Sequence, residues 1–179
     1  PDAICQDITV TLDATGNATI TAADIDNGSA DACGIASLTL DQTAYDCSHV
    51  GANTVTLTVT DVHGNTSPCT STVTVEDTTP PTAICQDITV QLDATGNATI
   101  TANDIDNGSN DNCSVTLSAT PLTFDCSNTG ANTVTLTATD PSSNTDDCTA
   151  TVTIEDNVAP TAICQDITVQ LDATGNATI

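Results

Sequence analysis

The chain contains no lysine and no arginine, against 24 aspartate and glutamate residues, so its formal net charge is −24. Nucleic acids and anionic membranes bind proteins through cationic side chains, and this composition excludes both as partners. No carboxylate can form a salt bridge with a lysine or arginine of the same chain. We therefore expect the self-repulsion of the acidic groups to be relieved by solvent, salt or bound cations.

Tryptophan is also absent, and Tyr45 and Phe124 are the only large aromatic residues. Closely spaced carboxylates can hydrolyse glycosidic bonds, but that chemistry needs a cleft with sugar-binding surfaces. The two histidines, His49 and His63, are isolated and do not recur along the chain. We therefore expect no enzymatic activity. There is no apolar run long enough to span a bilayer and no signal peptide, so we expect no direct membrane insertion.

What the chain does contain is a long repeat. Residues Ala83–Ile100 recur letter for letter as Ala162–Ile179, and equivalent segments open at Pro1, Pro81 and Pro160. A period of about 80 residues is the size of one small β-sandwich domain. The expected organisation is therefore one domain over residues 1–79, a second over 80–158, and the truncated start of a third repeat over 159–179.

Alternation of apolar and polar residues predicts the strands within each repeat. In TVTLTVTD, Thr54 to Asp61, the side chains of Val55, Leu57 and Val59 share one face while threonines take the other. Further strands are expected over Ile8–Leu12, Asn17–Ala22, Ile35–Leu40 and Thr70–Val75. No segment has helical periodicity, and about seven short strands per repeat predict an all-β, immunoglobulin-like sandwich. Short proline-containing joints predict an extended string of such domains.

Nine cysteines indicate an oxidising, extracellular setting. Cys5, Cys33, Cys47 and Cys69 recur as Cys85, Cys113, Cys126 and Cys148, and Cys164 begins a third set. Zinc is the alternative role for these cysteines, but the spacings lack the short knuckles of zinc sites. We therefore interpret them as structural disulfides.

The pairing is predicted from the arrangement of the sandwich, although four cysteines allow three pairings. The first and last strands of such a sandwich lie side by side, which favours Cys5–Cys69, while Cys33 and Cys47 bracket a central excursion. The predicted bridges are therefore Cys5–Cys69, Cys33–Cys47, Cys85–Cys148 and Cys113–Cys126, with Cys164 unpaired. In the chain-entropy model the longer closures contribute about 4 kcal/mol each and the shorter ones about 3 kcal/mol.

Two acidic patterns suggest calcium. Alternating oxygen ligands around a glycine turn suit a hard cation, and the same pattern is equally typical of an Asx-rich surface turn. The candidate ligands in this loop are Asp24, Asp26, Asn27 and Asp31, and, in the second repeat, Asp104, Asp106, Asn107 and Asp111. A second candidate is the joint after each domain, formed by Glu76 and Asp77 or Glu155 and Asp156, in reach of carboxylates such as Asp87. Calcium is thus a candidate ligand rather than a required cofactor.

The segments TVTLTVTDVHGNTSPCTSTVTVED and TVTLTATDPSSNTDDCTATVTIED carry a recognisable pattern. They resemble hyalin (HYR) and related immunoglobulin-like repeats, in which a strand ending in T-D-x-x-G-N leads to a cysteine and a final V-x-V strand. With ICQDITVQLDATGNATITA and DIDNGS, the whole unit is similar to tandem repeats of very large secreted Bacteroidota surface proteins. This resemblance implies a place on the outer surface, in some cases in adhesins used for gliding motility.

The expected function is that of a repeat segment in a long extracellular, cell-surface filament or adhesin stalk. Its expected partners are further copies of the same repeat, with a surface or glycan ligand that the sequence does not identify. Two alternatives belong to other classes: a self-assembling sheath or S-layer-like filament, and a glycan-binding lectin-like module. The copy over 159–179 has a further reading as a strand donated to another chain's domain.

Overall fold

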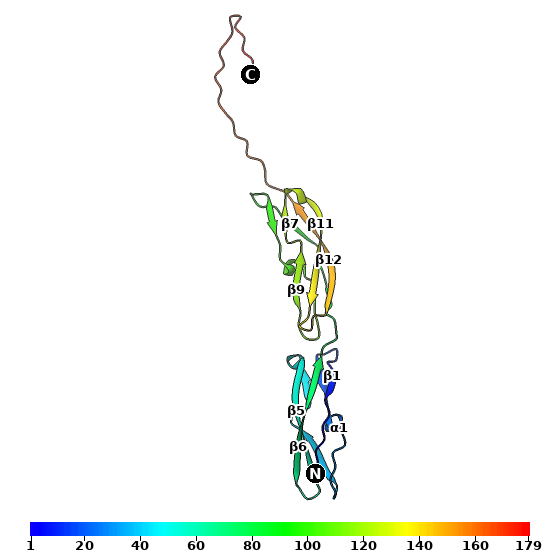
Figure 1. Cartoon of the computed structure of the whole chain (residues 1–179). Helices are drawn as coiled ribbons and strands as arrows, with labels where there is room; N and C mark the ends of the chain where they lie inside the picture. The colour runs from blue at the N-terminus through cyan, green and yellow to red at the C-terminus, as the bar shows by residue number, and fades with distance from the viewer.

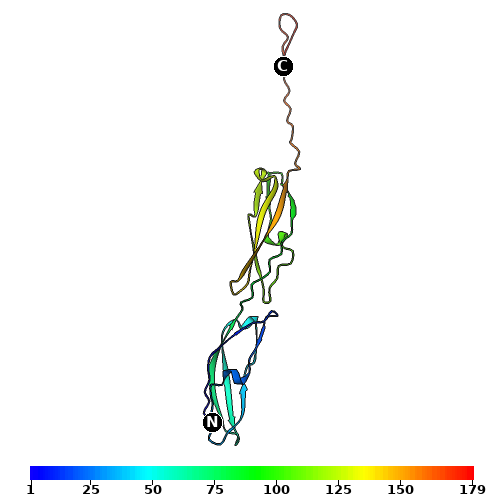
Figure 2. The ribbon, with the colours of Figure 1, turned by 90° about the vertical axis from the view of Figure 1, so that its right-hand side faces the viewer.

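The computed structural model describes every residue from Pro1 to Ile179 and contains two β domains arranged end to end, followed by an extended segment (Figures 1 and 2). The first domain comprises β1 (Ile8–Thr11), β2 (Asn17–Thr19), α1 (Ala22–Ile25), β3 (Ile35–Leu40), β4 (Ala44–Asp46), η1 (Cys47–His49), β5 (Gly51–Asp61) and β6 (Thr66–Glu76). The second comprises β7 (Ile88–Gln91), β8 (Asn97–Thr99), α2 (Ala102–Ile105), β9 (Thr116–Thr120), β10 (Thr123–Asp125), η2 (Cys126–Asn128), β11 (Gly130–Thr139) and β12 (Thr145–Glu155). No helix is both long and apolar enough to cross a membrane.

Each domain is a β-sandwich of a four-stranded and a two-stranded sheet, which confirms the predicted fold class. In the first domain the strand order is β1-β6-β5-β3, with β2 paired to β4. The first strand runs parallel to the last, with Ile8 opposite Val73, and β5 and β6 form a long antiparallel hairpin. The second domain repeats this plan as β7-β12-β11-β9 with β8 paired to β10.

The core of each domain lies between its two sheets. Val55, Leu57 and Val59 are completely buried, as the alternation in β5 predicts, and so is Val73 in β6. Tyr45 packs among them with 2% of its surface exposed, and Phe124 is the corresponding buried aromatic of the second domain. Each domain thus has one large aromatic side chain in its core.

One expectation about secondary structure is wrong. The segment Ala22–Ile25 forms a single helical turn, although the sequence has no helical period there. The turn is fixed locally, because the Asp24 carboxylate accepts hydrogen bonds from the backbone N–H and the hydroxyl of Thr21, at 2.7 and 2.8 Å. A capping box of this kind stabilises one turn without any apolar periodicity. The second repeat forms the same turn, α2, with Thr101 and Asp104.

The segment after β12 does not form the opening strands of a third domain. Residues 157–179 contain no strand and are exposed throughout, although 162–179 repeat 83–100 exactly. In both domains the first strand pairs with the last strand of the same repeat, and 162–179 contain no counterpart of that last strand. The turn Asp172–Asn176 nevertheless forms, because the Asp172 carboxylate accepts the backbone N–H groups of Thr174 and Asn176.

Candidate functional site

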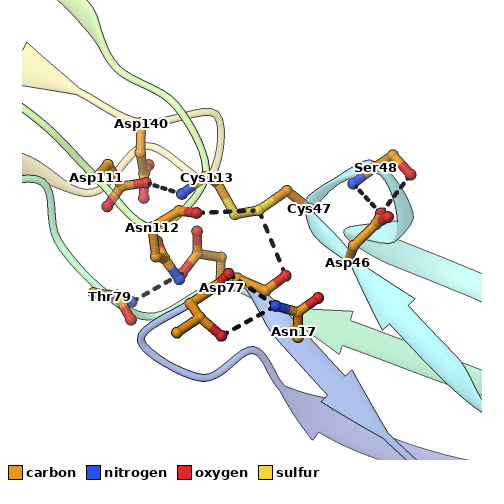
Figure 3. Close-up of a disulfide and its surroundings, with 12 residues drawn as sticks. Asn17, Asp46, Cys47, Ser48, Asp77, Thr79, Asp111, Asn112, Cys113 and Asp140 are labelled. Atoms are coloured by element: carbon orange, nitrogen blue, oxygen red, sulfur yellow. Dashed lines mark hydrogen bonds between the residues drawn. A yellow bond between two sulfur atoms is a disulfide. The ribbon is translucent and has the colours of Figure 1, made fainter.

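The joint between the two domains is closed by a disulfide bond. Cys47, at the start of η1 in the first domain, is bonded to Cys113 in the loop before β9 of the second, with 5.4 Å between their Cα atoms. Figure 3 shows this bridge running from one domain to the other, beside the linker that carries Asp77 and Thr79. Within the domains, Cys5 is bonded to Cys69 and Cys85 to Cys148. The two domains are therefore connected covalently twice, by the backbone and by a disulfide.

The expected pairings Cys33–Cys47 and Cys113–Cys126 are therefore wrong. Cys33 lies at the far end of its domain, because the carbonyl of the next residue, Gly34, accepts the N–H of Val62 just beyond the end of β5. Cys47 lies at the opposite end, just before β5 begins. An eleven-residue strand is about 35 Å long, whereas disulfide-bonded Cα atoms lie within about 7 Å. The chain between Cys33 and Cys47 passes once along the domain and does not return.

Gly16 permits the close approach of the two domains. It lies in the turn Asp13–Asn17 with φ of +75°, and a Cβ atom built on it would lie 2.7 Å from both the Cys47 sulfur and the Asn112 carbonyl oxygen. The equivalent turn in the second domain places a Cβ on Gly96 2.7 Å from the Cys126 sulfur. The D-A-T-G-N turn therefore forms the surface against which the disulfide packs. The sequence analysis did not assign this role to it.

Two asparagine side chains of the second domain also bind the first. The Asn112 amide donates to the backbone carbonyl of Asp13 at 3.0 Å and to the Asp77 carboxylate at 3.3 Å. The Asn144 amide donates to the backbone carbonyl of Asp77 at 3.2 Å and to the Asp140 carboxylate at 2.8 Å. The linker is thus held from two sides by loops of the following domain, which indicates a fixed rather than a freely hinged joint.

Two acidic side chains at this joint have buried oxygens without hydrogen-bond partners. Asp77 is only 6% exposed, and its Oδ2 has no partner, while the buried Oδ1 of Asp111 is also unpaired. Carboxylate oxygens of these two residues lie within 4.8 Å of one another and of the disulfide-bonded Cys113 sulfur, which is the one such group of three in the chain. A polar hollow of about 190 Å³, lined in part by Thr79, Pro80 and Asn112, opens beside Asp111.

The structure does not gather the other candidate calcium ligands. Their acidic groups cap local backbone instead: Asp24 caps α1, and the Asp26 and Asp31 carboxylates accept the N–H groups of Ser29 and Cys33. Corresponding local hydrogen bonds are accepted by Asp104, Asp106 and Asp156. The Glu155 carboxylate accepts the Gln91 amide, and the Asp87 carboxylate accepts the Thr151 N–H instead of meeting Asp77. Glu76 joins no cluster of acidic groups either, and the backbone N–H groups of Asn27 and Asn107 donate to the carbonyls of Ile4 and Ile84. The loop pattern is an Asx-type turn, and at the joint Asp77 meets Asp111 instead of Asp87.

Because these carboxylates accept local hydrogen bonds, the stability of the fold depends on pH. Hydrogen bonds from Thr21 hold the pKa of Asp24 below its usual value of 3.8, and hydrogen bonds from Thr15 do the same for the pKa of Asp13. A carboxylate whose pKa is lower in the folded state stabilises the fold above its unfolded pKa and loses that contribution as pH falls. We expect the melting temperature, measured by circular dichroism at constant salt, to be steady from about pH 7 to 5 and to fall below about pH 4. A melting temperature that rises from pH 4 to pH 2 would contradict this, because relief of charge repulsion would then outweigh the lost caps.

The fit at Gly16 can be tested with Gly16→Ala. The new methyl group strains a backbone of positive φ, at a cost of about 1 kcal/mol, and also forces Cys47 or the Asn112 carbonyl to move. We expect a smaller fraction of the Cys47–Cys113 disulfide at equilibrium in a glutathione redox buffer. Gly64→Ala is the matched control, because Gly64 has φ of +86° with open space around it. Equal disulfide fractions in the two variants would mean that Gly16 is not part of the contact.

No family model and no curated protein matches the sequence. Among solved structures, the chain is similar to Protocadherin Gamma B7 extracellular cadherin domains 1–4 (13% identity, 86% of this chain, 50% of that chain, TM-score 0.35). It is also similar to human mucin-like protocadherin EC1-2 (14% identity, 84% of this chain, 96% of that chain, TM-score 0.38). A third similar structure is that of fibronectin(III)-like modules of Clostridium thermocellum CbhA (10% identity, 93% of this chain, 97% of that chain, TM-score 0.31). The chain thus spans half the length of the first of these structures. Its assignment as a β-sandwich is given by the strand order and register described above.

Proposed function

We propose that this chain is a load-bearing segment of a long extracellular fibre, a stalk on the cell surface whose length comes from tandem repeats. The observation that carries the proposal is the Cys47–Cys113 disulfide, which joins consecutive domains end to end. A bond of this kind has no use in a freely jointed chain, since its effect is to fix the distance and orientation of neighbours. The disulfides also suit an oxidising environment outside the cytosol.

Other features support a spacer rather than an adhesive tip. The surface is acidic, without lysine or arginine, and offers neither tryptophan nor a distinctive loop for a ligand. The resemblance to hyalin-type repeats of Bacteroidota surface proteins agrees with this role, including that of a stalk in a gliding adhesin. The absence of lysine and arginine removes every trypsin cleavage site, which is useful for an exposed fibre.

Electron microscopy of native material tests the proposal. Thin single strands with a regular beaded outline are expected, because each domain is bonded to the next along one axis. Ordered multi-chain tubes would favour the sheath instead. Saturable binding of a glycan by one domain, measured on a glycan array and by calorimetry, would favour the lectin-like module.

We also propose that the joint binds a divalent cation, calcium being the best fit for oxygen ligands. Asp77 Oδ2 and Asp111 Oδ1 are buried without a partner, and the two carboxylates approach within 4.8 Å. The chain has no side-chain ammonium or guanidinium to neutralise them. The Asn112 side-chain oxygen, buried and unpaired, is available as a further ligand, and water in the adjoining hollow can supply others.

Calorimetric titration with calcium chloride tests this site. Wild-type protein is expected to bind about one ion more per joint than Asp77→Asn/Asp111→Asn, and its melting temperature should fall when a chelator is added. Asp147→Asn/Asp166→Asn is the control, because it removes the same charge from two exposed positions. Identical titrations of the wild type and the joint variant would exclude the site.

A further inference from the structure

We propose that Cys33 and Cys126, both unpaired here, are the open halves of the same joint disulfide, made with the preceding and the following repeat. The inference rests on the proposed function, because it needs neighbouring repeats. It means that every domain of the fibre is bonded to both of its neighbours, so that the partner at each end of this chain is another copy of the repeat. The two cysteines would then be connectors rather than spare thiols.

Cys126 occupies the same local structure as the paired Cys47. Each opens a short 3₁₀ turn, η1 or η2, and each turn is capped by the preceding aspartate. The Asp46 carboxylate accepts the Ser48 N–H at 2.9 Å, and the Asp125 carboxylate accepts the Ser127 N–H at 2.8 Å. The cap therefore holds both cysteines in the same place at the start of their turns.

The sulfur positions agree as well. The Cys47 sulfur lies 3.8 Å from the Gly16 carbonyl oxygen, and the Cys126 sulfur lies 3.7 Å from that of Gly96. Cβ atoms built on these two glycines would meet the respective sulfurs at the same 2.7 Å. The unpaired thiol is therefore already placed where the paired one reaches its partner, and it is exposed.

Cys33 corresponds in the same way to the paired Cys113. Both follow an aspartate by two residues, and both N–H groups donate to that aspartate, at 2.8 Å to Asp31 and at 3.0 Å to Asp111. Cys33 is exposed at the end of the first domain that points away from the joint, as the contact between Gly34 and Val62 shows. One difference is visible: Ala32 stands where the second domain has Asn112, so a joint before the first domain would lack the two hydrogen bonds of that amide.

The linker after the second domain is long enough for a following repeat to form the same joint. Glu155 to Ala162 is as long as Glu76 to Ala83, and the sequence that follows Ala162 is identical to that after Ala83. Asp156 also takes the place of Asp77 immediately after the last strand. A third domain would therefore meet the end of the second domain with the same length of chain and the same contacts as the second meets the first.

The bond itself forms by oxidation. Two thiols lose two protons and two electrons as the sulfur–sulfur bond forms, and the electrons pass to a disulfide donor, such as an oxidised small thiol or a thiol–disulfide oxidoreductase. Between Cys33 and Cys126 the reaction is blocked by distance, because Cys33 lies at the outer end of the first domain and Cys126 at the outer end of the second, with two sandwiches, each about 35 Å long, between them. The third free thiol, Cys164, corresponds to Cys85, which is bonded to Cys148 of its own repeat, so Cys33 and Cys126 require a neighbouring repeat.

The test is a chain with three complete repeats. Adding a copy of residues 101–156 after Ile179 completes the third repeat, because 162–179 already duplicate 83–100. The added copy alone carries Cys126→Ser, which removes its own free thiol, and Ser114→Thr, which marks the added Cys113 peptide by its mass. The oxidised protein is alkylated, digested with pepsin and mapped by mass spectrometry. Pepsin is suitable because it does not need lysine or arginine and acts at a pH that prevents disulfide exchange. A peptide pair joining Cys126 to the added copy of Cys113 is expected, with alkylated Cys126 reduced to a trace and Cys33 still alkylated.

The outcomes separate the two proposals. If Cys47–Cys113 is present and Cys126 is alkylated or bonded elsewhere, the proposal that every repeat is bonded to both neighbours is refuted. The disulfide between the first two domains, which supports the proposed function, is then unaffected. If Cys47–Cys113 is itself missing, the observation that carries the fibre is lost. Cys126→Ser in the same long chain is the control, since it should leave the added copy of Cys113 alkylated, with Cys85–Cys148 unchanged as the sign of a folded domain.

Discussion

Under tension in a single-molecule pulling experiment, the oxidised protein is expected to release almost no hidden length. The load enters at Cys5, passes through the bridge to Cys69, follows the chain to Cys85 and crosses the second bridge to Cys148. Only the stretch from Cys69 to Cys85 can then be drawn out, which amounts to about 55 Å of extended chain. The remainder of both domains is bypassed by disulfides even when their strands come apart.

After reduction the same experiment should give long steps. The chain from Cys5 to Cys148 then measures about 500 Å when fully extended, and each domain should unfold in a step of roughly 200 Å. Cys47→Ser/Cys113→Ser is the informative control, because it keeps both bypasses and should still give only short steps under oxidising conditions. Long steps in the oxidised wild type would show that Cys5–Cys69 and Cys85–Cys148 do not carry the load.

Loss of the joint disulfide should instead change stiffness and cooperativity. In Cys47→Ser/Cys113→Ser the two domains remain linked by the backbone and by Asn112 and Asn144, but the covalent closure over a sequence separation of 66 residues is gone. The chain-entropy model assigns such a closure about 4 kcal/mol. We expect the free energy of unfolding to fall by roughly 2–4 kcal/mol.

Two measurements check this expectation. Denaturant unfolding should change from one transition towards two, since each domain then unfolds with less influence on the other. Spin labels on the exposed Thr9 and Thr89 should report a broader distance distribution across the joint by pulsed electron paramagnetic resonance. Cys126→Ser alters a cysteine of the same kind outside the joint and should change neither result. An unchanged distance distribution in the joint variant would mean that the hydrogen bonds alone fix the orientation.

The sequence predicts the features that depend on alternation along one strand. Val55, Leu57 and Val59 are buried where the period of two places them, and Ile35–Leu40 is a strand with the predicted bounds. The turn Asp172–Asn176 shows why such features are readable: it forms from its own hydrogen bonds, even where no domain surrounds it.

The joint could not be predicted in this way, because it depends on which ends of two domains meet. Cys33 and Cys47 are near in sequence, and only the single passage of the chain between them, through β3 and β4, reveals that they lie far apart. The sequence did contain this information, because a Cys33–Cys47 disulfide would need a strand that returns the chain to the end of the domain where Cys33 lies. The acidic loop is ambiguous for a different reason: the spacing of Asp24 and Asp26 suits a cation and local backbone hydrogen bonds equally well, and in the structure both carboxylates accept local N–H groups.

The form of the joint also bears on how such a gene can change length. Each joint takes one cysteine from the domain before it and one from the domain after it, as Cys47 and Cys113 do. Deletion or duplication of one whole repeat, through recombination between identical stretches such as 83–100 and 162–179, leaves every remaining joint with both of its sulfurs. A repeat whose cysteines paired internally would tolerate this too, but without covalent contact to its new neighbour. In a fibre built as proposed, the number of repeats could therefore change by one at a time, and every joint would keep its disulfide.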